Sequence, residues 1–290
     1  TSYDSIREAL MRGDIKAALV IPPNMEADLM AGRHTPVQAV LDGTDSVTVA
    51  SSLALLRGRV AAFNSKIALA GTQVPSPVTL NTQAWFNREL KSTNSMVPGL
   101  IPLVLIMPSL AMALAITREK ELGSFETLAT TPVRGLEYLL GKLIPYVTYG
   151  LISAAIAVLV SLVWFQVPLR GRLSDLIVFT FLYLFASLGM SILISSFLAS
   201  QGTAMRVILF LFFVPSFFLA GIILPVDTRS GISQAVSFVL PATQFVQMTR
   251  GVFLKGLGMD DLLVPTLTLI ILGSLTLLIS LLVFRKQVDY

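Results

Sequence analysis

The sequence lacks cysteine, has a single histidine and is short of charge. Only 13% of its 290 residues are Asp, Glu, Lys or Arg, whereas 54% are hydrophobic, and soluble domains carry about 25% charged residues. The missing cysteine excludes disulfides, so a domain outside the cytoplasm must rely on its core. The net charge of +4 is spread out and gives no basic patch of the kind that nucleic acid requires. The composition therefore indicates a lipid environment.

Ionisable side chains are also missing from five long apolar runs, and a membrane span needs about 20 such residues. The runs are Val97–Thr117, Leu143–Phe165, Leu176–Ala199, Val207–Val226 and Leu262–Phe284. Carriers driven by protons or sodium place ionisable groups at membrane depth, so these spans favour another energy source. They also lack paired aspartates, HExxH and a Ser/His pair, which argues against an intramembrane protease. We expect no enzyme activity on this chain.

Lys and Arg between the runs predict the orientation of the spans. One set of loops holds Arg118, Lys120, Arg134, Lys142, Arg206, Arg285 and Lys286, and the opposite set holds Arg170, Arg172, Arg229, Arg250 and Lys255. This mild excess places the first set in the cytoplasm, with the C-terminus inside and residues 1–95 outside. Because residue 1 is Thr, and because an odd number of spans follows an outer domain, we expect a further span upstream.

Residues 1–95 predict a mixed α/β domain in front of the helical membrane domain of residues 96–290. Helical spacing marks Tyr3–Arg12, Asn24–Ala31 and Val47–Ala70, and extended runs mark Ala17–Ile21, Val37–Leu41 and Val78–Phe86. Asp42 and Asp45 could suggest a metal, but the other ligands of a calcium loop are absent. A turn with a helix cap is the better reading, and the lone His34 is expected in a solvated loop.

Several spans contain residues that disturb or tighten helix packing. Pro98, Pro102 and Pro108 lie in the first span, Pro145 opens the second and Pro215 lies in the fourth. They are either ordinary kinks or helices that bend during transport. Small residues recur in the third span, at Ser187, Gly189, Ser191, Ser195 and Ser196. They favour close helix packing, with a polar stripe along a substrate path as the alternative.

The most informative stretch joins the first two spans and reads REKELGSFETLATTP over residues 118–132. Leu122, Phe125, Leu128 and Ala129 fall on one helical face, and acids fall largely on the other, which predicts an amphipathic helix along the inner membrane surface. A plain connector needs only a few residues, so a docking surface for a cytoplasmic partner is the alternative that we favour. Its residues would be Arg118, Glu119, Glu121, Leu122, Phe125, Glu126, Thr130, Thr131 and Pro132.

Several motifs, in order along the chain, resemble those of ABC-2 type transporter permeases. Residues 118–132 resemble REKExGTxExLxxTP, and GKLIPY at 141–146 resembles GKxxPY. Upstream, WFNRELKS at 85–92 with MVPGL at 96–100 resembles the multidrug-export branch, as do DIKAALVIPP at 14–23 and LDGTD at 41–45. The similarity covers the whole chain. The sequence departs from the family pattern at Arg88, Ser95 and Ser124-Phe125. These departures do not change the fold that the resemblance implies.

The resemblance implies six spans, with a large outer domain between the first and second, so that the span expected before Thr1 would be the first. It also implies that residues 225–261 form an extracytoplasmic re-entrant element. Short amphipathic runs at Gly231–Phe238 and Ala242–Phe253, split by Pro241, agree with this because they are too short to span.

The resemblance further implies two permease domains, as a homodimer or heterodimer, and two ATPase domains in a bacterial inner membrane. This chain has no GxxxxGK[S/T] loop, so ATP and Mg would be held by a partner or fused domain. Residues 118–132 would be the coupling helix, with carboxylates for the ATPase and with Phe125 or Leu122 as the apolar seat. The uncharged spans suit a lipophilic or amphipathic substrate. The alternatives are a membrane sensor or receptor, and a permease-like domain fused to ATPase modules that serve another process.

Overall fold

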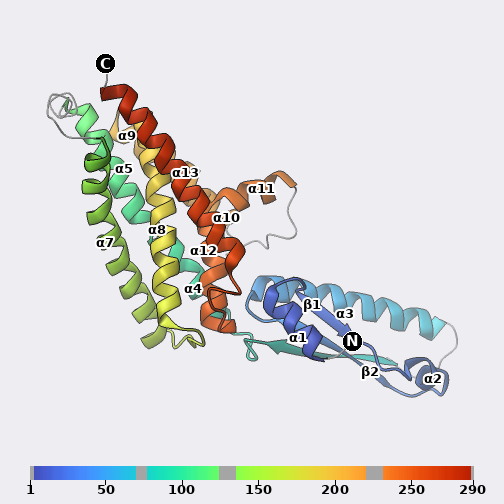
Figure 1. Cartoon of the computed structure of the whole chain (residues 1–290). Coiled ribbons are helices and arrows are strands. Elements are labelled where there is room, and N and C mark those ends of the chain that lie inside the picture. The colour runs from blue at the N-terminus through green and yellow to red at the C-terminus, as the bar shows by residue number, and fades with distance from the viewer. Residues whose placement is uncertain (1–2, 70–76, 124–134, 220–230, 289–290) are drawn as a thin grey trace. The chain divides into compact units, whose positions relative to one another are not determined.

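The structure is a computed structural model that describes residues 3–69, 77–123, 135–219 and 231–288. It divides into two compact units, Thr1–Ser95 and Met96–Tyr290, which are described here one at a time (Figure 1).

The first unit is a small mixed α/β domain. Its elements are α1 (Tyr3–Arg12), β1 (Ala17–Val20), α2 (Met25–Met30), β2 (Thr35–Asp42), α3 (Ser46–Leu69) and β3 (Val78–Trp85). The sheet has the order β1-β2-β3, and β2 runs antiparallel to β1 and parallel to β3. The helices and strands expected from the sequence are confirmed, with ends that differ by one or two residues.

Helices α1 and α3 pack on opposite faces of this sheet. Ile6 and Leu10, one helical turn apart on α1, are buried with Val40 of β2. Val40 pairs with Gln83 of β3, whereas Leu80 lies three positions earlier on β3 and so points to the other face. On that face Leu80 lies against α3. The period-2 pattern of β2 therefore builds a core on both sides of the strand.

The aspartates after β2 cap and turn the backbone. Asp42 Oδ1 accepts from the backbone N–H and the hydroxyl of Thr44. Asp45 Oδ1 accepts from the N–H of Val47 and of Thr48, so it caps α3. No metal-binding group of three or more His, Cys, Asp or Glu side chains occurs among the described residues. The cap reading of the sequence is confirmed.

The LDGTD turn and the WFNRELKS segment, more than forty residues apart, meet at the end of the sheet. The N–H of Gly43 donates to the carbonyl oxygen of Trp85 at 2.9 Å, and a Cβ on Gly43 would lie only 2.6 Å from that oxygen. Ser95, a departure from the family pattern, donates its hydroxyl to Thr44 O at 2.7 Å. Both motifs therefore serve one close backbone junction, which requires glycine at position 43.

The second unit contains the five expected spans. The first is formed by α4 (Ser92–Val104) and α5 (Ile106–Glu121), the second by α7 (Gly135–Val163), and the third by α8 (Leu173–Ser196). The fourth comprises α9 (Gln201–Ile208), the π-helical turn η1 (Leu209–Phe213) and α10 (Val214–Leu219), and the fifth is α13 (Leu263–Val288). In the described residues, five helical stretches have the length and hydropathy that a membrane span needs. The expectation of a helical membrane protein is confirmed.

The first and third spans form the centre of this unit. In the most apolar 18-residue stretch of these two spans, 67% and 56% of the residues are buried, whereas 28% or fewer are buried in each of the other three spans. Figure 1 shows α8 between α7 and α13. Glycines of both helices allow close approach: a Cβ on Gly189 of α8 would lie 2.6 Å from Thr276 Oγ1 of α13, and one on Gly273 of α13 would lie 2.3 Å from the ring of Phe185 of α8. These contacts support the packing interpretation of the small residues.

The first span is broken between α4 and α5, and neighbouring helices satisfy the carbonyls that the break frees. Pro102 has no N–H to offer the carbonyl four residues earlier, and Thr249 donates its hydroxyl to that Pro98 oxygen at 3.0 Å. Tyr183 of α8 donates to Pro102 O at 3.0 Å, and its ring stacks on Phe245 at 4.6 Å between centroids. The break is thus held by buried partners on two other elements.

The segment expected to be re-entrant is described from residue 231 onward. It contains α11 (Gly231–Val239), α12 (Pro241–Arg250) and the π-helical turn η3 (Gly251–Lys255). Pro241 begins α12, so the two short helices agree with the sequence. Every residue of α12 except Gln247 is buried. Arg250, which the charge count placed in a loop, is 9% exposed.

Candidate functional site at the end of α5

The residues expected to begin a coupling helix instead complete the first span. Arg118, Glu119 and Glu121 belong to the last turn of α5, which ends at Glu121. Gly123 follows with φ +73°, a conformation that ends helices. The predicted start of a separate helix at residue 118 is therefore wrong. Leu122 is 67% exposed just beyond the helix. Phe125, Glu126, Thr130, Thr131 and Pro132 lie outside the described residues.

Glu119 connects the first span to the second. Its Oε2 lies 2.5 Å from Nζ of Lys142 on α7 and accepts the hydroxyl of Tyr138 at 2.6 Å. The ammonium of Lys142 also lies 5.0 Å from the centre of the Tyr138 ring. The two charged side chains are 31% and 15% exposed, so this pair is shielded from water more than a surface salt bridge is.

Lys120 connects the first span to the end of the third. Its Nζ donates to the carbonyl oxygens of Ser195 and Ser196 at 3.2 and 2.6 Å. These are among the last carbonyls of α8, which lack partners within their own helix. A cation at this position also interacts favourably with the negative end of the helix dipole.

Glu121 connects the first span to the start of the fourth. Its Oε2 accepts from the backbone N–H and from Nε2 of Gln201, both at 3.1 Å. Gln201 is the first residue of α9, where a carboxylate complements the positive end of the dipole. Ser200 caps the same helix by accepting from Thr203 N. The acid on α5 thus stabilises the first turn of α9.

Three consecutive side chains of α5, called here the α5 end cluster, therefore bind three different helices. Glu119 binds α7, Lys120 binds α8 and Glu121 binds α9. The carboxylates of Glu119 and Glu121, which we expected to face a partner, thus also have partners inside the chain, and their contact with an ATPase stays a prediction. Such an arrangement can transmit a displacement of the segment after α5 to three spans at once.

Sequence reasoning missed the partners of this cluster, although part of the signal was present. Lys142 lies in the GKLIPY motif and Glu119 in the REKE motif, and the structure brings the two motifs together in one ion pair. Tyr138 and Gln201 had no motif to mark them. The carbonyls of Ser195 and Ser196 become acceptors only because α8 ends there.

The opposite end of the unit has its own connection. The N–H of Arg170 donates to Phe253 O, and its Nη1 donates to Leu254 O at 2.9 Å. The loop between α7 and α8 is thus held against η3. The described part of the loop between α5 and α7 and the loop between α7 and α8, which the charge pattern assigned to opposite sides, therefore lie at opposite ends of α8. Which end faces the cytoplasm stays a prediction.

Comparisons with known proteins agree with this architecture. The sequence profile of "ABC-2 family transporter protein" matches residues 1–282. The "Probable multidrug ABC transporter permease YbhS" of Escherichia coli strain K12 is 30% identical over 250 residues, which are 85% of this chain and 66% of that protein. "Probable multidrug ABC transporter permease YbhR" of the same organism is 26% identical over 276 residues, 94% of this chain and 74% of that protein.

A third relative from that organism, "Inner membrane transport permease YhhJ", is 25% identical over 293 residues, 98% of this chain and 77% of its own length. The chain thus spans about two thirds of the length of YbhS and about three quarters of YbhR and YhhJ. No solved structure matches it.

Proposed function

This chain belongs to the ABC-2 family of transporter proteins, and on that basis we propose that it is the membrane subunit of an exporter driven by a partner ATPase. The proposed cargo is a lipophilic or amphipathic molecule such as a drug. The relatives named as multidrug permeases support this substrate class, as do the predicted spans, which hold no ionisable residue.

The observation that carries the proposal is the α5 end cluster. An ATPase that changes shape on the membrane surface needs a contact that reaches several spans, and Glu119, Lys120 and Glu121 provide one at the point where the chain leaves the first span. We place the ATPase contact on the segment that follows, from Leu122 to Pro132. In this mechanism Leu122 seats the partner and the cluster passes its displacement to α7, α8 and α9.

We propose that the other subunits or domains of the transporter supply what this chain lacks. ATP and Mg would be held by the ATPase, on a separate subunit or a fused domain. A second permease domain, identical or different, would complete the path. We place the protein in the inner membrane with the α5 end cluster at the cytoplasmic end and with Thr1–Ser95 in the periplasm.

A cross-linking experiment tests this assignment, since these 290 residues contain no competing cysteine. Leu122→Cys would carry a photoactivatable benzophenone, and Trp164→Cys is the matched control, because Trp164 is 81% exposed in the loop between α7 and α8. We expect an ATP-binding protein to cross-link at position 122 alone. Labelling of position 122 by a membrane-impermeant maleimide from the periplasmic side would contradict the proposal.

A further inference from the structure

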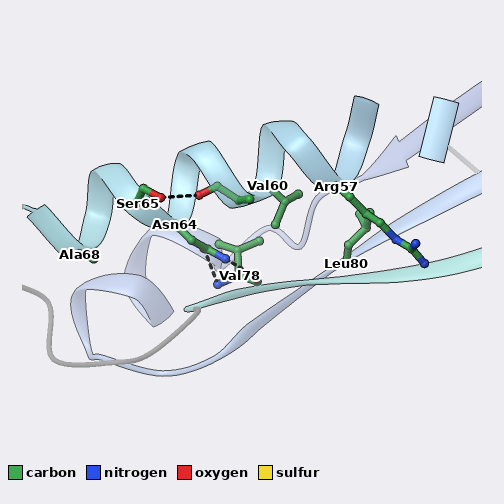
Figure 2. A pocket seen from close by; sticks show the side chains of 8 residues that line it. Arg57, Val60, Asn64, Ser65, Ala68, Val78 and Leu80 are labelled. Carbon is green, nitrogen blue, oxygen red and sulfur yellow. Dashed lines mark hydrogen bonds between the residues drawn. The ribbon is translucent and has the colours of Figure 1, made fainter. Parts of the chain in front are cut away.

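A groove in the first unit lies between α3 and β3, and the proposed transport cycle makes no use of it. It has a volume of about 500 Å³, within the roughly 300–1,000 Å³ of small-molecule sites. Its lining includes Arg57, Val60, Asn64 and Ser65 of α3, with Val78 and Leu80 of β3. Figure 2 shows Val60 and Asn64 on the side of the helix that faces the strand, whereas the hydroxyl of Ser65 donates to the carbonyl oxygen of Ala61.

The two ends of the groove differ in chemistry. At one end Asn64 holds the start of β3, because its Nδ2 donates to Val78 O at 2.9 Å and its Oδ1 accepts from Val78 N at 3.1 Å. At the other end the guanidinium of Arg57 reaches past Leu80 (Figure 2). Val60 lies between these ends. Arg57 and Asn64 are seven positions apart on the α-helix, so the apolar stretch between them is about 10 Å long.

The two elements that line the groove, α3 and β3, carry charge of one sign. No Asp or Glu occurs between Asp45 and Glu89, so α3 carries Arg57, Arg59 and Lys66 without an acid. Among the residues that the structure describes, Arg57 forms no salt bridge. Its five N–H donors form a fork that suits carboxylate and phosphate. An apolar floor that ends at such a fork matches a molecule with an apolar body and an anionic head.

We propose that this groove binds a monomeric anionic amphipath, with its alkyl chain along Val60 and Leu80 and its phosphate or carboxylate on Arg57. The stretch of about 10 Å suits a single short chain rather than the two long chains of a bilayer phospholipid. The ligand is therefore a free molecule and not the membrane surface. This site lies within the first unit and does not depend on which ATPase drives the second.

The test uses the full chain with Ser65→Cys as its single cysteine, in nanodiscs of phosphatidylcholine. Ser65 lines the groove and is nearly isosteric with cysteine. Octyl phosphate, added below its micellar concentration, is expected to slow maleimide labelling of this position saturably. Octyltrimethylammonium, which has the same chain and the opposite charge, is expected to leave the rate unchanged.

Two substitutions and one matched control locate the site. Arg57→Gln is expected to weaken protection by roughly tenfold or more, as the loss of a charge-assisted contact predicts. Ala61→Phe, which fills the groove from the helix, should abolish protection. Arg59→Gln removes the same charge two residues away, outside the lining, and should match the parent chain. A melting curve of each variant shows that it remains folded.

Three results in phosphatidylcholine nanodiscs would overturn the proposal. The first is no protection by octyl phosphate at any concentration. The second is equal protection by octyltrimethylammonium, and the third is equal weakening by Arg57→Gln and Arg59→Gln. An additional arm replaces phosphatidylcholine with phosphatidylglycerol and omits octyl phosphate. If phosphatidylglycerol alone slowed maleimide labelling of position 65, the ligand would be the membrane surface, which would contradict binding of a free amphipath.

Discussion

Oε2 of Glu119 lies 2.5 Å from Nζ of Lys142, and this ion pair joins the end of the first span to the start of the second. Each belongs to a separate motif that resembles the permease family, REKE in one case and GKLIPY in the other. Tyr138 donates to the same carboxylate oxygen, so the acid has two partners from α7. The motifs are therefore two halves of one contact.

Removal of one member of this pair should destabilise the membrane unit. Glu119→Gln leaves the Lys142 ammonium, which is only 15% exposed, without a counter-ion. A partly shielded charge of this kind costs about 1–3 kcal/mol, between the values for surface and buried pairs. The measurement is the unfolding midpoint in detergent, with Arg118→Gln on the exposed neighbour as the control. The charge-swapped pair Glu119→Lys with Lys142→Glu should recover part of the loss, and a swap no better than either single change would contradict the pairing.

Thr249 and Pro102 should be coupled energetically. Thr249→Val leaves the Pro98 carbonyl without its hydroxyl donor, at a cost of about 1 kcal/mol for a hydrogen bond between membrane helices. In a Pro102→Ala background, residue 102 regains an N–H that can reach this carbonyl, so Thr249→Val should then cost much less. A double-mutant cycle on unfolding in detergent measures the difference. Equal costs in both backgrounds would show that the hydroxyl does not compensate the proline.

The contact between α8 and α13 should tolerate no added methyl group. A Cβ on Gly273 would lie 2.3 Å from Phe185 and 3.2 Å from the Cα of Ala186, so Gly273→Ala should destabilise the unit by about 1–3 kcal/mol. The control is Gly141→Ala on α7, where a Cβ meets nothing within 4 Å and where alanine should be neutral or stabilising by up to about 1 kcal/mol. Both are read from unfolding midpoints, and the same response at both positions would contradict the packing.

Much of the fold was predictable because its signals are local. The absence of charged residues predicts the five spans. In residues 1–95, hydrophobic residues that recur with a period of 2 predict the strands, and those that recur with a period of 3.6 predict the helices. Asp45 was identifiable as a cap because a short acid directly precedes an apolar helical run. Each of these features depends on residues that are close in sequence.

The candidate site was less predictable because its contacts are long-range. The acids of residues 118–121 looked like the polar face of a short helix, since nothing local shows that the span continues to Glu121. The partners of Glu119, Lys120 and Glu121 lie on α7, α8 and α9, and they include three backbone groups at helix ends, which are the carbonyls of Ser195 and Ser196 and the N–H of Gln201. A backbone acceptor leaves no trace in the side-chain sequence. The ends of helices that meet in space therefore had to be seen in the structure.

The most direct test of the central claim is efflux by the permease with Lys120→Met, reconstituted in proteoliposomes with the ABC ATPase that copurifies with it. This change removes the contacts to Ser195 and Ser196 and leaves the proposed docking segment intact. Arg172→Met, which removes an exposed charge directly before α8, is the matched control. We predict that the ATPase still binds and hydrolyses ATP while ATP-driven ethidium transport falls by roughly tenfold or more, a loss of about 1.4 kcal/mol in coupling. Unchanged transport by Lys120→Met, in a complex that contains the ATPase, would contradict the claim that the α5 end cluster carries the motion.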